Sequence, residues 1–216
     1  MFTGIIEATG TLSRLSPKGG DLSVTIQSSS LDFSDVKLGD SIATNGVCLT
    51  VTALGAQSFS ADLSAETLAL TRFGEYKVGQ LLNLEKALLA TGRLGGHLVS
   101  GHVDGVTSLL AMEQSARAWQ LWFALPAELA PFIAHKGSVT IDGISLTVNE
   151  VLTDRFRLTI VPHTAAQTTL LTLQKGSRVH IEVDLLARYI QRLLTTPVAA
   201  PKGGVDLALL AQRGFL

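Results

Sequence analysis

Several residues whose side chains can take part in chemistry have a counterpart of a different type 97 positions away in the chain. The pairs are Cys48 and Ser145, Ile5 and His102, Glu66 and His163, Gly39 and Lys136, and Ala87 and Asp184. Thiol, hydroxyl, imidazole and carboxylate groups serve nucleophilic and acid–base chemistry. The pattern therefore indicates two equivalent small-molecule sites whose roles have diverged.

Each of these residues also has a plainer interpretation. A lone cysteine such as Cys48 is most often a small buried apolar side chain. His102 and His163 also fit ordinary loop positions. Lys136 fits a solvated surface charge, and Asp184 fits a helix cap. Taken singly, the residues leave their roles open.

The motifs of several enzyme classes are absent from the sequence. The glycines near position 95 lack the dinucleotide-binding spacing, no phosphate-binding loop is present, and no nucleophile elbow surrounds Ser100 or Ser145. His97 and His102 lie five positions apart with Asp104 close by, but no further cluster of ligands joins them. We therefore expect no metal site, and dinucleotide, ATP-dependent and metal-hydrolase chemistry is disfavoured.

The elements that must position these residues appear when the sequence is shifted by 97 positions, because two halves then align without a gap. Residues 1–7 fall on 98–104, and Ser-Ile-Ala-Thr-Asn-Gly-Val-Cys-Leu-Thr-Val at 41–51 falls on Ser-Val-Thr-Ile-Asp-Gly-Ile-Ser-Leu-Thr-Val at 138–148. Identities at the same offset include Phe59 with Phe156, Thr67 with Thr164, Gly79 with Gly176 and Glu85 with Glu182. This period is the length of a whole domain and exceeds that of a solenoid unit. Two tandem copies of one fold are favoured over two unrelated segments that share a hairpin pattern.

Each copy has the pattern of a small β-barrel. Asn45-Gly46 and Asp142-Gly143 predict two-residue type I′ turns, which need positive φ at both positions. After each turn, apolar residues alternate with Cys48 and Thr50, or with Ser145 and Thr147, which share the opposite face. Further strands are expected at 4–12, 22–27, 58–63 and 81–87, with counterparts 97 residues on. About six short strands per copy suggest a closed or nearly closed barrel, with a sandwich as the alternative.

Helices are expected at three kinds of place. Short ones should follow the cap at Ser64 and begin at Pro162. After Asp184 an apolar stripe recurs at helical spacing, formed by Leu186, Tyr189, Ile190, Leu193 and Leu194. Such a helix needs a surface to cover, and we favour contact between subunits. The expected division is residues 1–97, 98–184 and a helical tail at 185–216, the tail comprising this helix, a linker at 195–204 and a short terminal helix at 205–216.

Composition narrows the class of protein further. The chain has 216 residues, is 46% apolar and carries a net charge of −1, so it has neither the composition of a disordered chain nor a basic footprint for nucleic acid. Its single cysteine cannot form an internal disulfide. The start lacks the pattern of a signal peptide, and no apolar run reaches the ~18 residues of a membrane span. We expect a cytoplasmic protein without a membrane segment.

Four segments together resemble a known family. They are Met-Phe-Thr-Gly-Ile-Ile-Glu at 1–7, Asn-Gly-Val-Cys-Leu-Thr-Val at 45–51, Gly-Gly-His-Leu-Val-Ser-Gly-His-Val-Asp-Gly at 95–105 and Asp-Gly-Ile-Ser-Leu-Thr-Val at 142–148. In this order they resemble the riboflavin synthases of the α-chain type, which have two lumazine-binding repeats. The resemblance spans essentially the whole chain and is weakest from about residue 195 onwards.

The resemblance implies a mainly β fold of two tandem six-stranded Greek-key barrels with a C-terminal helix. It implies dismutation of two 6,7-dimethyl-8-ribityllumazine molecules by four-carbon transfer, giving riboflavin and 5-amino-6-ribitylamino-uracil, with no metal or organic cofactor. It also implies a homotrimer whose active site lies between neighbouring subunits. A duplicated fold suits this reaction, because two copies of one substrate must be held facing each other.

Site residues follow from the same resemblance. The catalytic candidates are His102 as proton carrier, Asp184 as its partner, Ser145 and Cys48 as nucleophile or positioning donor, Lys136 as a fixed positive charge and Phe2 as an apolar wall. The substrate-binding candidates are Gly4, Ile5, Ile6, Ser41, Cys48, Leu49, Thr50, Asp62, Leu63, Ser64, Ala65, Glu66, Thr67, His97, Gly101, His102, Val103, Lys136, Ser145, Leu146, Thr147, Val161, Pro162, His163, Thr164, Ala165 and Ala166. His163 stands where the other copy has Glu66, so the two sites should not bind identically.

Two other functions share this pattern. A non-catalytic carrier of lumazine or flavin would bind the ligand without forming riboflavin. A regulatory or scaffold module would bind flavin tightly without turnover and would not need His102. The polar hairpin faces in both copies and the apolar stripe of the tail favour the enzyme.

Overall fold

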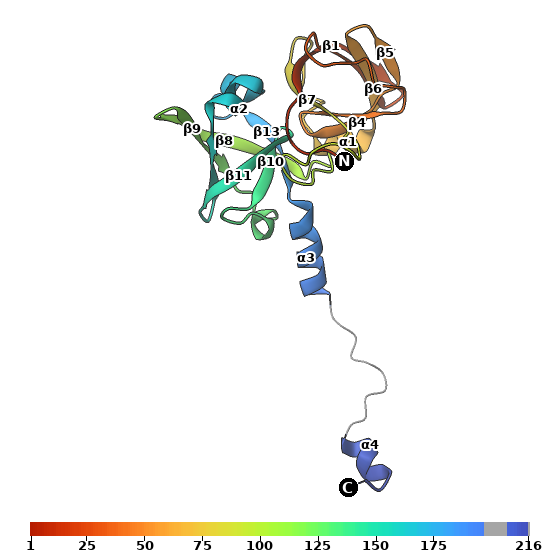
Figure 1. Cartoon of the computed structure of the whole chain (residues 1–216), viewed down its shortest axis with the longest axis vertical. Coiled ribbons are helices and arrows are strands. Elements are labelled where there is room, and N and C mark those ends of the chain that lie inside the picture. The colour runs from red at the N-terminus through yellow and green to blue at the C-terminus, as the bar shows by residue number, and fades with distance from the viewer. Residues whose placement is uncertain (197–206, 216) are drawn as a thin grey trace.

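A computed structural model describes residues 1–196 and 207–215, and it contains two β units followed by a helix (Figure 1). The first unit runs from red to yellow in the figure and the second from green to cyan. The two units correspond to the two repeats of the sequence, and the domain boundaries at 1–97 and 98–184 stay a prediction.

The N-terminal unit is a seven-stranded antiparallel sheet with one short helix. Its elements are β1 Ala8–Lys18, β2 Asp21–Gln27, β3 Ser41–Thr44, β4 Val47–Thr50, β5 Ala53–Gly55, β6 Ser58–Leu63, α1 Ala65–Leu70 and β7 Leu81–Lys86. The strand order is β4-β3-β7-β1-β2-β6-β5. The predicted helix after Ser64 is confirmed, and the Ser64 hydroxyl accepts from the Thr67 N–H as its N-cap.

The C-terminal unit is a closed six-stranded barrel. Its elements are β8 Gly105–Ser115, β9 Ala118–Ala124, a 3₁₀ turn at Ala130–Phe132, β10 Ser138–Ile141, β11 Ile144–Val151, β12 Arg155–Ile160, α2 Pro162–Gln167, a 3₁₀ turn at Thr169–Thr172 and β13 Arg178–Val183. The order β10-β11-β12-β9-β8-β13 closes on itself, because β13 also pairs with β10. A barrel in this unit excludes the sandwich.

The two units differ in how one strand is divided. The single long strand β11 corresponds to both β4 and β5, which lie at opposite edges of the N-terminal sheet. Only Val51 and Thr52 separate β4 from β5; the Val51 N–H donates to the Asp40 carbonyl and the Thr52 N–H to the Ser60 carbonyl. The two edges therefore approach each other without a continuous ladder. The expectation of six strands is confirmed for the second unit, whereas the first has seven because this strand is interrupted.

Both predicted hairpins are present with the expected turn geometry. Asn45 and Gly46 have φ of 45° and 82°, and Asp142 and Gly143 have φ of 44° and 80°. The apolar residues after each turn point into the barrel, and Cys48 and Ser145 are half-buried on the outer face. The alternation read from the sequence is confirmed in both copies.

A buried polar network joins the two units, and it repeats with the 97-residue offset. In one half, the Asn83 amide donates to the Asp142 carbonyl (3.0 Å) and accepts from the Thr169 N–H (2.9 Å). In the other half, His180 takes the place of Asn83: its Nδ1 bonds to the Asn45 carbonyl and its Nε2 to the Arg72 N–H, both at 2.8 Å.

These partners define the form of His180. The Asn45 carbonyl can only accept, so Nδ1 carries the proton; the Arg72 N–H can only donate, so Nε2 is bare. The ring is therefore neutral in this arrangement. Burial agrees with this, because it lowers the pKa of His180 to about 4.

The tail helix α3 spans Leu185–Thr195 and begins at the predicted cap, since the Asp184 carboxylate accepts from the Leu186 N–H (3.0 Å). Its apolar stripe is uncovered: Tyr189, Leu193 and Leu194 are 64%, 75% and 81% exposed. A further helix, α4, spans Leu207–Gln212 within the predicted terminal helix. Most of the predicted linker lies outside the described residues. No helix in the described part of the chain is long and apolar enough to cross a membrane.

Candidate active site

The start of each repeat leaves its own sheet and crosses to the other unit. Phe2 and Val99 form a β-bridge where the two segments meet, with N–O distances of 2.8 and 3.1 Å. This crossing explains why the strand expected at 4–12 begins only at Ala8. Segments 1–6 and 98–103 are called the crossing segments below.

Each crossing segment ends against the hairpin of the opposite unit. The Gly4 carbonyl accepts from the Ser145 N–H (2.8 Å), and the Gly101 carbonyl accepts from the Cys48 N–H (2.9 Å). Both glycines have φ near 80°, and a Cβ at either would lie 2.5 Å from the Ser145 Cβ or 2.7 Å from the Cys48 Cβ. Only glycine permits this close approach.

Two composite sites result, one on each barrel. The N-barrel site combines the Cys48–Thr50 face of β4 with residues 101–103 of the crossing segment. The C-barrel site combines residues 145–147 of β11 with residues 4–6. The structure therefore brings together predicted binding residues that lie 53 or 141 positions apart in pairs such as Cys48 with Gly101 and Gly4 with Ser145.

The C-barrel site holds a serine–histidine pair. The Ser145 hydroxyl lies 2.7 Å from Nδ1 of His97, whose ring is buried. Burial lowers the pKa of His97 below its usual 6.5, and the nearby Asp184 charge opposes that shift. A neutral imidazole here can accept the proton of the Ser145 hydroxyl.

A smaller cavity of about 300 Å³ lies at the start of the second repeat. Its lining includes Ser100, His102, Val103, Glu182 and Arg188. His102 is exposed beside it, and its backbone N–H donates to the Ser100 hydroxyl (3.2 Å). Asp104, at its edge, forms an ion pair with Arg188 of α3.

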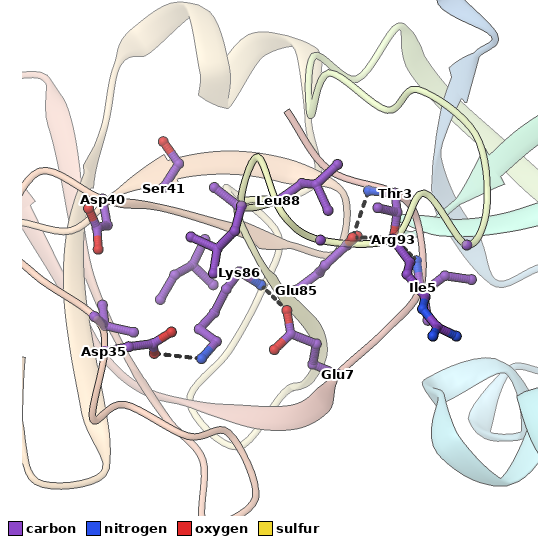
Figure 2. Close-up of a pocket in the computed structure, with 16 residues that line it drawn as sticks. Thr3, Ile5, Glu7, Asp35, Asp40, Ser41, Glu85, Lys86, Leu88 and Arg93 are labelled. Atoms are coloured by element: carbon purple, nitrogen blue, oxygen red, sulfur yellow. Dashed lines mark hydrogen bonds and ion pairs between the residues drawn. The ribbon is translucent and has the colours of Figure 1, made fainter.

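A larger cavity of about 600 Å³ occupies the matching place in the first repeat (Figure 2). Thr3, Ile5 and Glu85 line it at positions equivalent to Ser100, His102 and Glu182. Figure 2 shows the Lys86 side chain paired with Asp35, at 2.6 Å. The two cavities occupy equivalent places in the two repeats. They differ in size and lining because the helix α3 follows the second repeat, whereas a loop follows the first.

Other predicted site residues differ in how exposed they are and in whether their side chains form bonds within the protein. Asp62 and Ser64 lie at the end of β6, a strand that contacts β4, and Asp62 pairs with Lys18 (2.8 Å). Glu66, His163 and Lys136 are exposed, and in the described chain their side chains make no hydrogen bond or ion pair. Besides His97, four predicted binding residues have buried side chains; these four are apolar and can offer a ligand only their backbone: Leu49, Leu63, Leu146 and Ala165.

One predicted role, that of Phe2, does not fit the structure, and the predicted role of Asp184 stays a prediction. Phe2 is 0% exposed and packs with Ala43 and Val99 where the units meet, so its ring cannot serve as a wall against substrate. Asp184 makes no hydrogen bond to His102 within the described residues of this single chain, so its predicted part beside His102 stays a prediction. Its carboxylate caps α3, and its charge acts on His97.

Two features of the site were missed from the sequence. The pairing of Ser145 with His97 joins residues 48 positions apart, and no local pattern announces it. The roles of Glu85 and Glu182 were also missed, although their identity in the two repeats was a usable signal.

Comparisons with known proteins agree with this geometry. The lumazine binding domain family matches the chain twice, at residues 3–87 and 100–184. The crystal structure of LumP complexed with riboflavin has the same fold, with a TM-score of 0.77 and 24% identity, covering 85% of this chain and 99% of that one. The fold and the family match thus define a protein with two lumazine binding domains.

Relatives of full length narrow this class. The riboflavin synthase of Photobacterium phosphoreum is 52% identical over 217 residues, and that of Bacillus subtilis (strain 168) is 40% identical over 216, each covering 100% of both chains. The chain belongs to the riboflavin synthase family.

Proposed function

We propose that this protein is a riboflavin synthase, a transferase that converts two molecules of 6,7-dimethyl-8-ribityllumazine into riboflavin and 5-amino-6-ribitylamino-uracil. The observation that carries the proposal is the pair of composite sites, each made from a hairpin face of one barrel and a crossing segment of the other. The family membership supports the same activity.

A duplicated site suits this reaction because both reactants are the same molecule. Holding two reactants in register contributes effective molarities of ~10⁵–10⁸ M, so positioning can supply much of the rate. The two sites differ chemically in a way that suits unequal roles, since one carries the Cys48 thiol and the other the Ser145 hydroxyl.

The acid–base step falls to the residues of the two sites. One lumazine must lose a proton from its C7 methyl group, and a nucleophile must add to the other ring. His97 and Ser145 form a hydrogen-bonded pair that can activate a hydroxyl or water. His102, exposed at the smaller cavity, is the second proton carrier, and Lys136 adds a positive charge.

The pH dependence of turnover tests the part played by His97. An imidazole base works when neutral, so its contribution is lost as pH falls through its pKa. Burial lowers that pKa, and the acid limb of kcat/KM is therefore expected below pH 6.5. Kinetics between about pH 5 and pH 8 measure the limb. A limb above pH 6.5, or one that is unchanged in His97→Gln, would contradict the assignment.

The activity itself is tested with purified protein and 6,7-dimethyl-8-ribityllumazine alone. We expect two substrates consumed for each riboflavin formed, followed by riboflavin fluorescence and mass balance, with no metal or nucleotide added. Binding without product would identify a ligand carrier instead.

We also propose that α3 joins subunits into a homotrimer and that the active site is shared between neighbours. The support is the uncovered apolar stripe, whose leucines would each contribute ~1.5–3 kcal/mol if buried. Leu193→Glu is expected to shift the protein towards monomer in analytical ultracentrifugation and to lower activity with it. Gln191→Glu on the same helix is the charge-matched control. Unchanged sedimentation of Leu193→Glu would show that this stripe is not the interface.

A further inference from the structure

Two buried carboxylates, Glu85 and Glu182, anchor the crossing segments, and each also lines one of the two cavities described above. Glu85, on β7, is 3% exposed. Its Oε1 accepts from the Thr3 N–H (2.6 Å) and the Thr3 hydroxyl (2.7 Å), and its Oε2 accepts from the Gly4 N–H (2.9 Å). One carboxylate therefore fixes two consecutive residues of segment 1–6.

The second repeat contains the same arrangement. Glu182, on β13, is also 3% exposed. Its Oε1 accepts from the Ser100 N–H and hydroxyl, both at 2.7 Å, and its Oε2 accepts from the Gly101 N–H (3.1 Å). The three bonds of each anchor thus correspond one to one.

The chemistry of the donors requires an acceptor-only side chain. Burial raises the pKa of both carboxyls, and the bonds from Thr3 and Gly4, or from Ser100 and Gly101, act to lower it. Bonds to an ionised carboxylate are stronger than bonds between neutral groups. An uncharged amide cannot replace this anchor, because its NH₂ would face an N–H donor.

The anchored residues are those that complete the site on the opposite barrel. Glu85 belongs to the N-terminal unit, yet the carbonyl of the Gly4 that it holds accepts from Ser145 of the C-terminal unit. Glu182 belongs to the C-terminal unit, yet Gly101 accepts from Cys48 of the N-terminal unit.

We propose that Glu85 and Glu182 are crossed positioning residues, each carried by one barrel and holding in place the segment that completes the other barrel's site. That these are substrate sites rests on the proposed function, whereas the crossed anchoring itself does not. Each site is thereby built on both barrels, so neither barrel alone presents a complete one.

The single cysteine of the chain offers a direct test, because it lies in the N-barrel site beneath Gly101. The labelling rate of Cys48 with N-ethylmaleimide is measured on the ligand-free, full-length protein. Glu182→Gln is expected to speed labelling about tenfold by releasing residues 100–103. Glu85→Gln leaves the bonds from Ser100 and Gly101 to Glu182 in place, but it frees the segment whose Phe2 packs near Cys48, so it should speed labelling about threefold at most.

A mirrored background tests the other direction. In a Cys48→Ser/Ser145→Cys protein, the only thiol lies in the C-barrel site beneath Gly4. There Glu85→Gln should speed labelling about tenfold and Glu182→Gln should not. A general loosening of the fold would speed labelling in both backgrounds and cannot produce this crossed pattern.

Two further variants show whether a change in labelling comes from loss of the anchor or from misfolding. Glu113→Gln, an exposed carboxylate on β8, should leave both labelling rates unchanged. If Glu182→Gln fails to fold, Ser100→Ala removes only the hydroxyl from the same anchor and should still speed Cys48 labelling about threefold. The proposal is overturned if each anchor variant affects its own barrel's thiol as much as or more than the opposite barrel's thiol, or if neither Glu182→Gln nor Ser100→Ala changes Cys48 labelling. Since no substrate is present, these outcomes are independent of whether the protein makes riboflavin.

Discussion

Ser145→Ala is expected to lower kcat by ~10²–10⁴-fold, the usual contribution of a positioned acid–base or nucleophilic pair. The Ser145 hydroxyl is the hydrogen-bond partner of His97 Nδ1 at 2.7 Å, so the substitution removes the nucleophile or donor and leaves the buried imidazole without its partner. Steady-state kinetics with the lumazine substrate measure the effect.

Stability must be measured beside activity, because an orphaned buried donor or acceptor costs ~1–3 kcal/mol. Urea unfolding of Ser145→Ala should show a loss no larger than this. Ser108→Ala, a half-buried serine on β8 of the same barrel, is the matched control and should retain full turnover. A kcat within threefold of the parent in Ser145→Ala would remove Ser145 from the mechanism.

His180→Leu is expected to destabilise the protein by ~1–4 kcal/mol, since it leaves one buried group without its partner, at ~1–3 kcal/mol, and one partly buried group, at less. Those groups are the Asn45 carbonyl and the Arg72 N–H, which bond to the two ring nitrogens. Urea unfolding monitored by circular dichroism gives the value.

The first repeat suggests a substitution that should restore the stability lost in His180→Leu. Asn83 makes the corresponding two bonds at the equivalent position, so His180→Asn should recover more than half of the loss. A His180→Leu protein as stable as the parent, or a His180→Asn protein no better than His180→Leu, would show that these bonds do not hold the barrels together.

The same residue sets a pH dependence. The pKa of His180 is lowered to about 4, so the unfolded chain binds its proton more readily. The stability it contributes is present above pH 6.5 and lost as pH falls towards 4, by ~3 kcal/mol at most. Burial also raises the pKa of Asp142 to about 7, which acts with the opposite sign. The difference between the parent and His180→Asn therefore isolates the histidine, and an absent difference at pH 4.5 would contradict its burial as a neutral ring.

The features that the sequence by itself determined are local or periodic. The Asn-Gly and Asp-Gly turns, the alternating faces around Cys48 and Ser145, the cap at Ser64 and the helix after Asp184 depend on neighbouring residues, and the structure confirms each of them. The 97-residue repeat is a periodicity of the sequence, and the two matches to the lumazine binding domain confirm it. The family followed from motifs of the same local kind. The individual roles of the candidate residues remain predictions.

Only the tertiary structure decided how the two copies combine. Nothing local shows that residues 1–6 leave their own sheet, that Phe2 is buried where the units meet, or that Ser145 pairs with His97. The interrupted strand between β4 and β5 was equally hidden, because Val51 matches Val148 in the sequence while the ladder differs. The physical reason is that such contacts join residues up to 141 positions apart, as Gly4 and Ser145 are, and depend on which surfaces the two units bury against each other.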